Sequence, residues 1–280
     1  MKPAAPRRRD AFTLVELLVV LATVGVLMAL LLPAINLARV RTQRVACLSN
    51  LRQLGLAFLS YVNDSNGGLP VNFPLLAPRQ PNPEDWFLGF AGYPHDPMYG
   101  PAPQYACTNV DSARASKLFA YHQSVELSHC PADTRTVGGL PFVRNYSANS
   151  WMNGSAVGDP SGKLVTALDS PSADSGLMMK FFRNESQLTH PALLWNLIDE
   201  ASETINDSMF IVDMSVSAEL ADKPTRRHVG AYSISFADGH SELFRLTGLG
   251  AGRLKMDQSP TTSVDPDWAN LSRFTTSPNR

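Results

Sequence analysis

The first chemically unusual residue is Glu16, a carboxylate inside an otherwise apolar run near the N-terminus. From Phe12 to Ile35 the chain is almost continuous hydrocarbon, and Glu16 is its one ionisable side chain. A carboxylate is costly to place in a membrane and is retained there where it has a partner and a function. Because two buried charges become tolerable when they are paired, we expect Glu16 to neutralise a cationic group.

His228 and Asp238, which Gly239 follows, are a second group of residues that could take part in catalysis or metal binding. Histidine and aspartate are typical of catalytic and metal sites, but no nucleophile with an obvious activating partner accompanies them. We therefore expect the chain not to be an enzyme. The favoured role of His228 is a structural hydrogen bond near the base of a hairpin, with Asp238 as a turn residue. Catalysis and metal binding are the alternatives.

The apolar run has the length of a membrane-spanning helix. Its 24 residues would extend over about 36 Å as a helix, enough to cross a bilayer. Arginines that precede it predict a cytoplasmic N-terminus and an extracytoplasmic body. A secretory signal would be shorter and would end in a small-residue cleavage site, which is missing before Asn36. A plain membrane anchor would explain the length but not Glu16.

Composition places the rest of the chain among globular proteins. The 280 residues are 44% hydrophobic and 18% charged, which excludes disordered and collagen-like classes. The net charge of −1 divides into +6 for residues 1–60 and −7 for the remainder. This split indicates a localisation signal at the N-terminus, and no nucleic-acid partner is predicted.

Beyond the apolar run, the spacing of hydrophobic residues predicts that the helix continues in amphipathic form over 36–64. The turn residues of 63–68 then end it. Asp238-Gly239 lies between two alternating runs and predicts a two-residue hairpin in which Ile234 pairs with Leu243. The residues that would then share the face packed on the helix are Tyr232, Ile234, Phe236 and Leu243. The predicted fold class is α+β, with one long helix on a small antiparallel sheet and long loops.

Residues 7–16, Arg-Arg-Arg-Asp-Ala-Phe-Thr-Leu-Val-Glu, resemble the processing site of type IV prepilins and type II secretion pseudopilins. The resemblance implies cleavage between Ala11 and Phe12 by a prepilin peptidase and methylation of Phe12. Glu16 is then the fifth mature residue, and Pro33 corresponds to a proline that loosens the helix. Ala11 departs from the glycine that the family prefers.

A branch of these prepilin-like proteins has further motifs that this chain resembles. They are Cys130-Pro131-Ala132-Asp133, the Asn-Tyr-Ser-Ala-Asn-Ser-Trp stretch at 145–151, and a His-x9-Asp-Gly motif formed by His228, Asp238 and Gly239. The resulting organisation is a leader (1–11), a transmembrane and filament-core helix (12–35), an amphipathic helix (36–64), an extracytoplasmic α+β head (65–246) and a loosely packed tail (247–280).

Two further expectations concern cysteines and cations. Since disulfides persist outside the cytoplasm, Cys107 and Cys130 are the expected pair, with Cys47 packed as a small hydrophobic residue. No cofactor is expected. Ca²⁺ binding is an open alternative, which the resemblance implies because the major type II pseudopilins hold this ion in a C-terminal loop. Its candidate ligands are carboxylates: Asp199, Glu200, Asp213, Asp238 and Glu242.

The resemblance implies a structural subunit of a pseudopilus or pilus in the inner membrane. Its partners would be copies of itself, other pilins, the prepilin peptidase, an inner-membrane assembly platform with its ATPase, and membrane lipid. One alternative keeps the anchor and makes the head an adhesin or ligand-binding module, supported by the aromatic, proline-rich residues 70–103. Another is a membrane-tethered hydrolase, which would need a converging nucleophile, base and orienting group.

Overall fold

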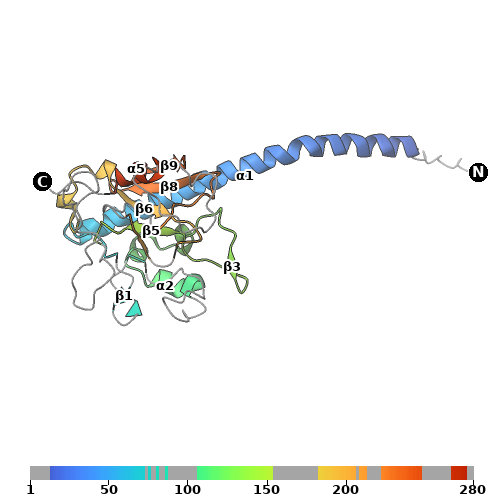
Figure 1. The fold of residues 1–280 in the computed structure, drawn as a ribbon. Helices are drawn as coiled ribbons and strands as arrows, with labels where there is room; N and C mark the ends of the chain where they lie inside the picture. Colours follow the sequence, from blue (N-terminus) through green and yellow to red (C-terminus); the bar gives the residue numbers. More distant parts are fainter. Residues whose placement is uncertain are drawn as a thin grey trace, which may run out of the picture. The chain divides into compact units, whose positions relative to one another are not determined.

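The computed structural model describes residues 13–72, 75–76, 80–81, 86–87, 106–153, 182–205, 208–212, 222–247 and 266–275. The chain divides into two compact units, residues 1–42 and 43–280. Helix α1 (Leu14–Asp64) begins in the first unit and ends in the second (Figure 1).

Helix α1 confirms the long helix that the hydrophobic pattern predicts. It has 51 residues and continues through Pro33, so of the kink or local melting that a proline at this position predicts, melting does not occur. Its end also lies where the sequence places it. Asn66 and Gly67 take positive φ values of 52° and 80°, and the N–H of Gly67 donates to the carbonyl of Val62 at 2.9 Å. This left-handed end satisfies one of the last carbonyls of the helix.

In the first unit, every described residue from 13 to 39 is exposed, although nearly all of them are apolar. Within the described part of the chain, α1 alone has the length and hydropathy that a bilayer crossing requires. Apolar side chains on all faces of a helix are stable only in lipid or against other protein.

The second unit is built on one five-stranded sheet. Its order is β7-β5-β6-β8-β9, and all neighbours are antiparallel except the parallel pair β5 and β7. The strands are β5 (Tyr146–Asn149), β6 (Trp195–Asp199), β7 (Met209–Phe210), β8 (Ala231–Phe236) and β9 (Ser241–Arg245). A long helix with a mainly antiparallel sheet confirms the predicted α+β class.

Short elements fill the connections. Two small hairpins pair β1 (Leu75–Leu76) with β2 (Gln80–Pro81) and β3 (Thr136–Val137) with β4 (Leu140–Pro141). Three short helical elements follow one another between residues 110 and 128: α2 (Val110–Arg114), α3 (Phe119–His122) and the 3₁₀ turn η2 (Val125–Ser128). Gln123 ends α3 because its φ of 54° is left-handed. Further 3₁₀ turns are η1 (Ala106–Thr108), η3 (Glu185–Gln187) and η4 (Pro191–Leu193).

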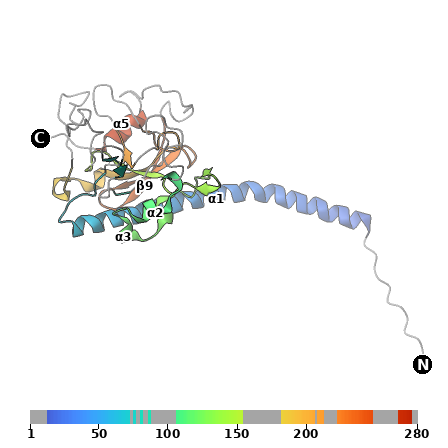
Figure 2. The same cartoon turned by 90° about the horizontal axis from the view of Figure 1, so that it is seen from below.

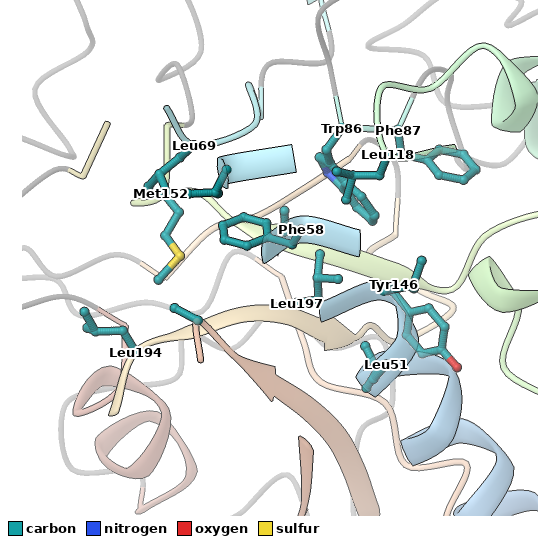
Figure 3. Close-up of a cluster of buried hydrophobic side chains, with 14 of the residues drawn as sticks. Leu51, Phe58, Leu69, Trp86, Phe87, Leu118, Tyr146, Met152, Leu194 and Leu197 are labelled. Atoms are coloured by element: carbon teal, nitrogen blue, oxygen red, sulfur yellow. The ribbon is translucent and has the colours of Figure 1, made fainter. Parts of the chain in front are cut away.

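One face of the sheet packs against the last part of α1. Leu51 and Phe58 of the helix meet Tyr146 of β5 and Leu197 of β6 in a buried apolar cluster (Figure 3). Trp86, from the proline-rich segment, lies in the same cluster at 3% exposure. Its indole N–H donates to the carbonyl of Ser208 at 3.0 Å. This aromatic residue of the segment therefore belongs to the core.

The opposite face of the sheet carries a second apolar cluster, which includes Trp195 and Tyr232. Helix α5 (Pro266–Ser272) covers it, so α1 and α5 lie on opposite faces of the sheet (Figures 1 and 2). Leu271 is buried within the cluster and Phe274 packs against it. The N–H of Trp195 also donates to the carbonyl of Phe274 at 2.9 Å. Residues 266–275 are thus docked on the head, in contrast to the loosely packed tail that the sequence predicts.

The hairpin at Asp238-Gly239 forms, but its predicted register is wrong by one residue. Ile234 pairs with Glu242 instead of Leu243, and four residues, 237–240, connect β8 to β9. Since side chains alternate along a strand, a shift of one residue exchanges the faces of β9. Phe244 therefore takes the place predicted for Leu243. The predicted face of β8 is also wrong, because Tyr232 and Ile234 pack in the second cluster, away from α1.

Candidate functional site

The first candidate site is the N-terminal turn of α1. The Glu16 carboxylate accepts hydrogen bonds from the N–H of Thr13 at 2.8 Å and from its hydroxyl at 2.7 Å. The N–H of Glu16 donates back to Thr13 Oγ1 at 3.3 Å. Thr13 precedes the helix and Glu16 is its third residue, so the two side chains form a capping box. Within one chain, Glu16 therefore has a local partner.

The processing residues Ala11 and Phe12 lie outside the described residues. Glu16 is exposed, and it is the single ionisable group of the apolar first unit from residue 13 to residue 38. Pro33 is an internal residue of α1. The sequence pattern Thr-x-x-Glu before an apolar run is typical of a capping box. The role that the sequence predicts for Glu16 rests on its charge and does not include this pattern.

The second candidate site is a buried group of four side chains in the head: Cys47, Cys130, Asp199 and His228. One potential ligand atom from each lies within 4.8 Å of all the others. Cys47 comes from α1, Cys130 follows η2, Asp199 ends β6, and His228 precedes β8. Each residue is at most 1% exposed. We call this group the four-residue cluster.

Polar contacts connect the members of the four-residue cluster. Cys47 Sγ lies 3.4 Å from Asp199 Oδ2, and Cys130 Sγ lies 3.4 Å from His228 Nε2. His228 Nε2 is also 3.3 Å from Asp199 Oδ2. The hydroxyl of Tyr146 is 3.2 Å from Cys47 Sγ. The sequence pattern predicts a structural hydrogen bond for His228 and does not bring the two cysteines to it.

Burial and the neighbouring groups shift the acid–base equilibria of the cluster. Burial disfavours a charged imidazole, yet the hydrogen bonds to Asp199 and Cys130 outweigh it and raise the pKa of His228 to about 9. The hydrogen bond with Cys47, burial and the Asp199 carboxylate together raise the pKa of the Cys130 thiol. Burial likewise raises the pKa of Tyr146. With this pKa, His228 is protonated at neutral pH.

Arg227 joins the four-residue cluster to the Cys-Pro-x-Asp segment. Its guanidinium donates to Asp199 Oδ1 at 2.7 Å and lies 3.6 Å from Asp133 Oδ2. Asp133 also accepts two-pronged hydrogen bonds from Arg135, at 3.0 and 2.7 Å. Burial opposes the Asp133 charge, but the bonds from Arg135 and the nearby charge of Arg227 lower the pKa of Asp133 to about 2.

The sequence motifs are explained by these contacts. The Asn145 side chain accepts from the N–H of Cys130 at 2.7 Å and donates to Asp133. This holds the Cys-Pro-x-Asp turn, in which the N–H of Asp133 donates to the carbonyl of Cys130. Pro131 offers its carbonyl to Gln43 of α1 at 3.1 Å.

The two ends of the His-x9-Asp-Gly motif flank β8 and both contact α1. At one end, Arg44 donates to the carbonyl of His228 at 2.8 Å. At the other end, the Cα of Gly239 comes within 3.4 Å of the place where a Cβ on Gly55 would lie. Asp238 is a turn residue, because its carboxylate accepts from the N–H of His240 at 3.1 Å.

The predicted disulfide between Cys107 and Cys130 is not formed. All three cysteines are free. Cys107 is a buried residue of η1, and burial raises the pKa of its thiol. Cys130 is directed to His228 instead. Sequence spacing could not reveal this, because the partners of Cys130 in the cluster lie on segments 69 to 98 residues away along the chain.

The predicted Ca²⁺ ligands are not brought together as a set by the described residues. Asp199 faces sulfur and nitrogen atoms, which Ca²⁺ does not prefer as ligands. Asp238 is in the hairpin turn with His240, and Asp213 lies outside the described residues. Glu200 is buried and accepts from the Ser147 hydroxyl, whereas Glu242 is exposed on β9. Calcium binding stays an untested prediction.

Comparison with known proteins identifies the N-terminal element. Residues 6–32 match the family model for the prokaryotic N-terminal methylation motif. Residues 6–32 therefore contain a methylation motif of the prepilin type, and this motif with the apolar helix α1 indicates membrane anchoring. Neither the curated proteins nor the solved structures gave a match. The family model covers the leader and the first part of α1, and it does not extend to the head.

Proposed function

We propose that this chain is a structural, non-enzymatic subunit of a type II secretion pseudopilus or a type IV pilus-like filament. It inserts into the inner membrane with its N-terminus in the cytoplasm and its head outside. A prepilin peptidase cleaves it between Ala11 and Phe12 and methylates Phe12. Residues 12–35 then stack against those of neighbouring subunits.

The observation that carries this proposal is the match of residues 6–32 to the methylation motif. Two features of the first unit support it. The side chains from residue 13 to residue 39 are exposed and mostly apolar, so they need lipid or neighbouring helices as partners. Glu16 lies on the first turn of this apolar helix, four residues along the chain from the residue whose amine cleavage before Phe12 would create.

The proposed role of Glu16 follows from charge. The new amine of Phe12 is a cation within the membrane, and the Glu16 carboxylate of a neighbouring subunit neutralises it. The contact joins different surfaces of the two subunits, so it is heterologous and propagates as a helix instead of closing. It also sets the axial offset between subunits. The capping box keeps Glu16 satisfied by Thr13 in each subunit before this exchange of partners.

The head provides the surface of the filament in this proposal. The chain belongs to the branch with the His-x9-Asp-Gly motif, which anchors β8 to α1 at both ends of the strand. Its partners are copies of itself, related pilins, the prepilin peptidase, and an inner-membrane platform with its assembly ATPase. A head of this size suits a minor or lineage-specific subunit.

The capping box offers a sharp test of the charge pairing. Glu16→Gln keeps a side chain that can complete the box but removes the charge. Thr13→Val removes the capping hydroxyl but keeps the carboxylate. We expect Glu16→Gln to insert into the membrane and to be processed, yet to be lost from purified filaments. Thr13→Val should be incorporated. Intact mass of the membrane fraction confirms processing of both variants.

Two results would contradict the pairing. If Glu16→Gln entered filaments as well as the unaltered chain, the charge would have no role in assembly. If Thr13→Val were excluded as strongly as Glu16→Gln, loss of the helix cap would explain the defect and the charge would not be needed. Glu16→Ala, which lacks both functions, serves as the reference for complete loss.

A further inference from the structure

We propose that Cys47, Cys130, Asp199 and His228 form a structural zinc site that fastens the head to α1. The inference rests on the second unit alone and does not depend on the proposed filament function. Two sulfurs, one imidazole nitrogen and one carboxylate oxygen are ligand types that Zn²⁺ accepts in a four-coordinate site.

The spacing of the ligand atoms fits one tetrahedral ion. Zinc–ligand bonds of roughly 2.0–2.3 Å place the ligand atoms roughly 3.3–3.8 Å from one another. The separations Cys47 Sγ to Asp199 Oδ2 and Cys130 Sγ to His228 Nε2 are both 3.4 Å, and His228 Nε2 to Asp199 Oδ2 is 3.3 Å. All remaining pairs are within 4.8 Å. A small contraction brings all four atoms onto a common centre.

The surrounding groups balance the charge of such a site and orient its ligands. Two thiolates and one carboxylate carry three negative charges, and Zn²⁺ together with Arg227 supplies three positive ones. Arg227 holds the second oxygen of Asp199 at 2.7 Å, which leaves Oδ2 free to face the sulfurs and the imidazole. The Tyr146 hydroxyl lies 3.2 Å from Cys47 Sγ and can donate to a thiolate there. Outer hydrogen bonds of this kind fix metal ligands in place.

The placement of His228 is maintained at a cost in backbone strain. Val229, the next residue, has a φ of 58°, a left-handed conformation that is strained for a β-branched side chain, and it is 65% exposed. Because it is exposed, the Val229 side chain contributes little packing to offset this strain. Such strain is retained where the surrounding structure needs a particular geometry, and here the turn directs His228 toward the two sulfurs.

A complete set of four protein ligands makes the site structural, because no position is left for a substrate or a reacting water. The ligands come from α1, the segment after η2, the end of β6 and the segment before β8. The ion would thus connect segments up to 181 residues apart, since Cys47 and His228 are the most distant pair. A surface cavity of about 360 Å³ is lined by Thr225, Arg226 and Arg227 among others, so it lies beside the arginine that contacts Asp199.

The competing use of these residues is a disulfide between Cys47 and Cys130. A disulfide requires the two sulfurs to bond at about 2.05 Å, and it would employ only two of the four groups. In the structure both cysteines are free, and each sulfur contacts a nitrogen or oxygen atom of the other groups. Convergence of Asp199 and His228 on the sulfurs is explained by a metal ion and not by a disulfide.

The test uses the full chain in detergent, purified with a reductant and without a histidine tag. After loading with zinc and gel filtration, elemental analysis should find one zinc per chain. Co²⁺ in place of zinc should give a thiolate-to-metal charge-transfer band. Cys130→Ser should weaken zinc retention at least tenfold and remove most of that band. Cys107→Ser, at a buried cysteine outside the cluster, is the matched control and should bind like the unaltered chain.

Three results would overturn the proposal. The first is the absence of both zinc and the cobalt band from the reduced, unaltered chain, a result that needs no folded variant. The second is equal zinc retention by Cys130→Ser and the unaltered chain. The third is a disulfide between Cys47 and Cys130 in protein isolated without reductant, identified by mass mapping of peptides. Mass mapping that instead finds both thiols protected by metal and released by a chelator would support the site.

Discussion

Replacing Arg227 with alanine should be among the most destabilising single changes in the head. The Arg227 side chain is 10% exposed, and its partner Asp199 is fully buried. Alanine would remove the hydrogen bonds to Asp199 Oδ1 at 2.7 Å and to the Glu200 carbonyl at 2.9 Å. Breaking a buried ion pair from one side leaves an uncompensated charge and costs about 3–5 kcal/mol. That is a large part of the free energy of unfolding of a typical domain, about 5–15 kcal/mol.

The assay for Arg227→Ala is urea unfolding of the full chain in detergent, with a chelator present so that the ion pair alone is measured. Fluorescence of the buried Trp151 and Trp195 reports on the head. The expected loss lowers the urea midpoint by at least about 1 M. Arg114→Ala is the control, because its ion pair with Asp111 is exposed and should contribute less than about 1 kcal/mol. Equal midpoints for the two variants would refute the electrostatic account of the cluster.

Three further predictions concern single positions in the head. The pKa of Asp133 is lowered to about 2, so its ion pairs should stabilise the head fully above about pH 4 and lose this effect as the pH falls through 2. In Asp133→Asn, the free energy of unfolding should therefore change less with pH over this range. Gly239→Ala should lower the free energy of unfolding in urea by about 1–2 kcal/mol, since φ is +89° and the new Cβ would lie 3.0 Å from Leu59. Gly55→Ala should be neutral or stabilising, because its Cβ would meet Gly239 at an ordinary van der Waals distance. Val229→Gly should raise the melting temperature by relieving a left-handed backbone at an exposed residue, and a lowered melting temperature would contradict the strain.

The elements that the sequence predicts best are those set by local pattern. Helix α1 and its end follow from an unbroken hydrophobic sequence and from Asn66-Gly67, residues that accept positive φ. The hairpin between β8 and β9 was predicted from Asp238-Gly239 in the same way. Its register was not, because the loop has four residues and not two, a choice made by packing of Gly239 against α1.

The four-residue cluster shows the limit of local pattern. Cys47 has the spacing of an apolar position on α1, so the sequence predicts a small hydrophobic residue there, and burial confirms that part. Its chemistry depends on Asp199 and His228, which tertiary contacts bring from 152 and 181 residues away. Arg44 is a similar case. Its neighbours in the sequence indicate a solvent-exposed charged residue, and only the folded chain brings it to the carbonyl of His228, to which it donates a hydrogen bond.

The most direct test of the central claim is the identity of the mature N-terminus. The chain is extracted from membranes of cells with an active prepilin peptidase and analysed by intact mass and N-terminal sequencing. A known prepilin processed in the same cells serves as the control. The account predicts a polypeptide that begins with methylated Phe12. A chain that keeps its arginine-containing leader, while the control is fully processed, would contradict it.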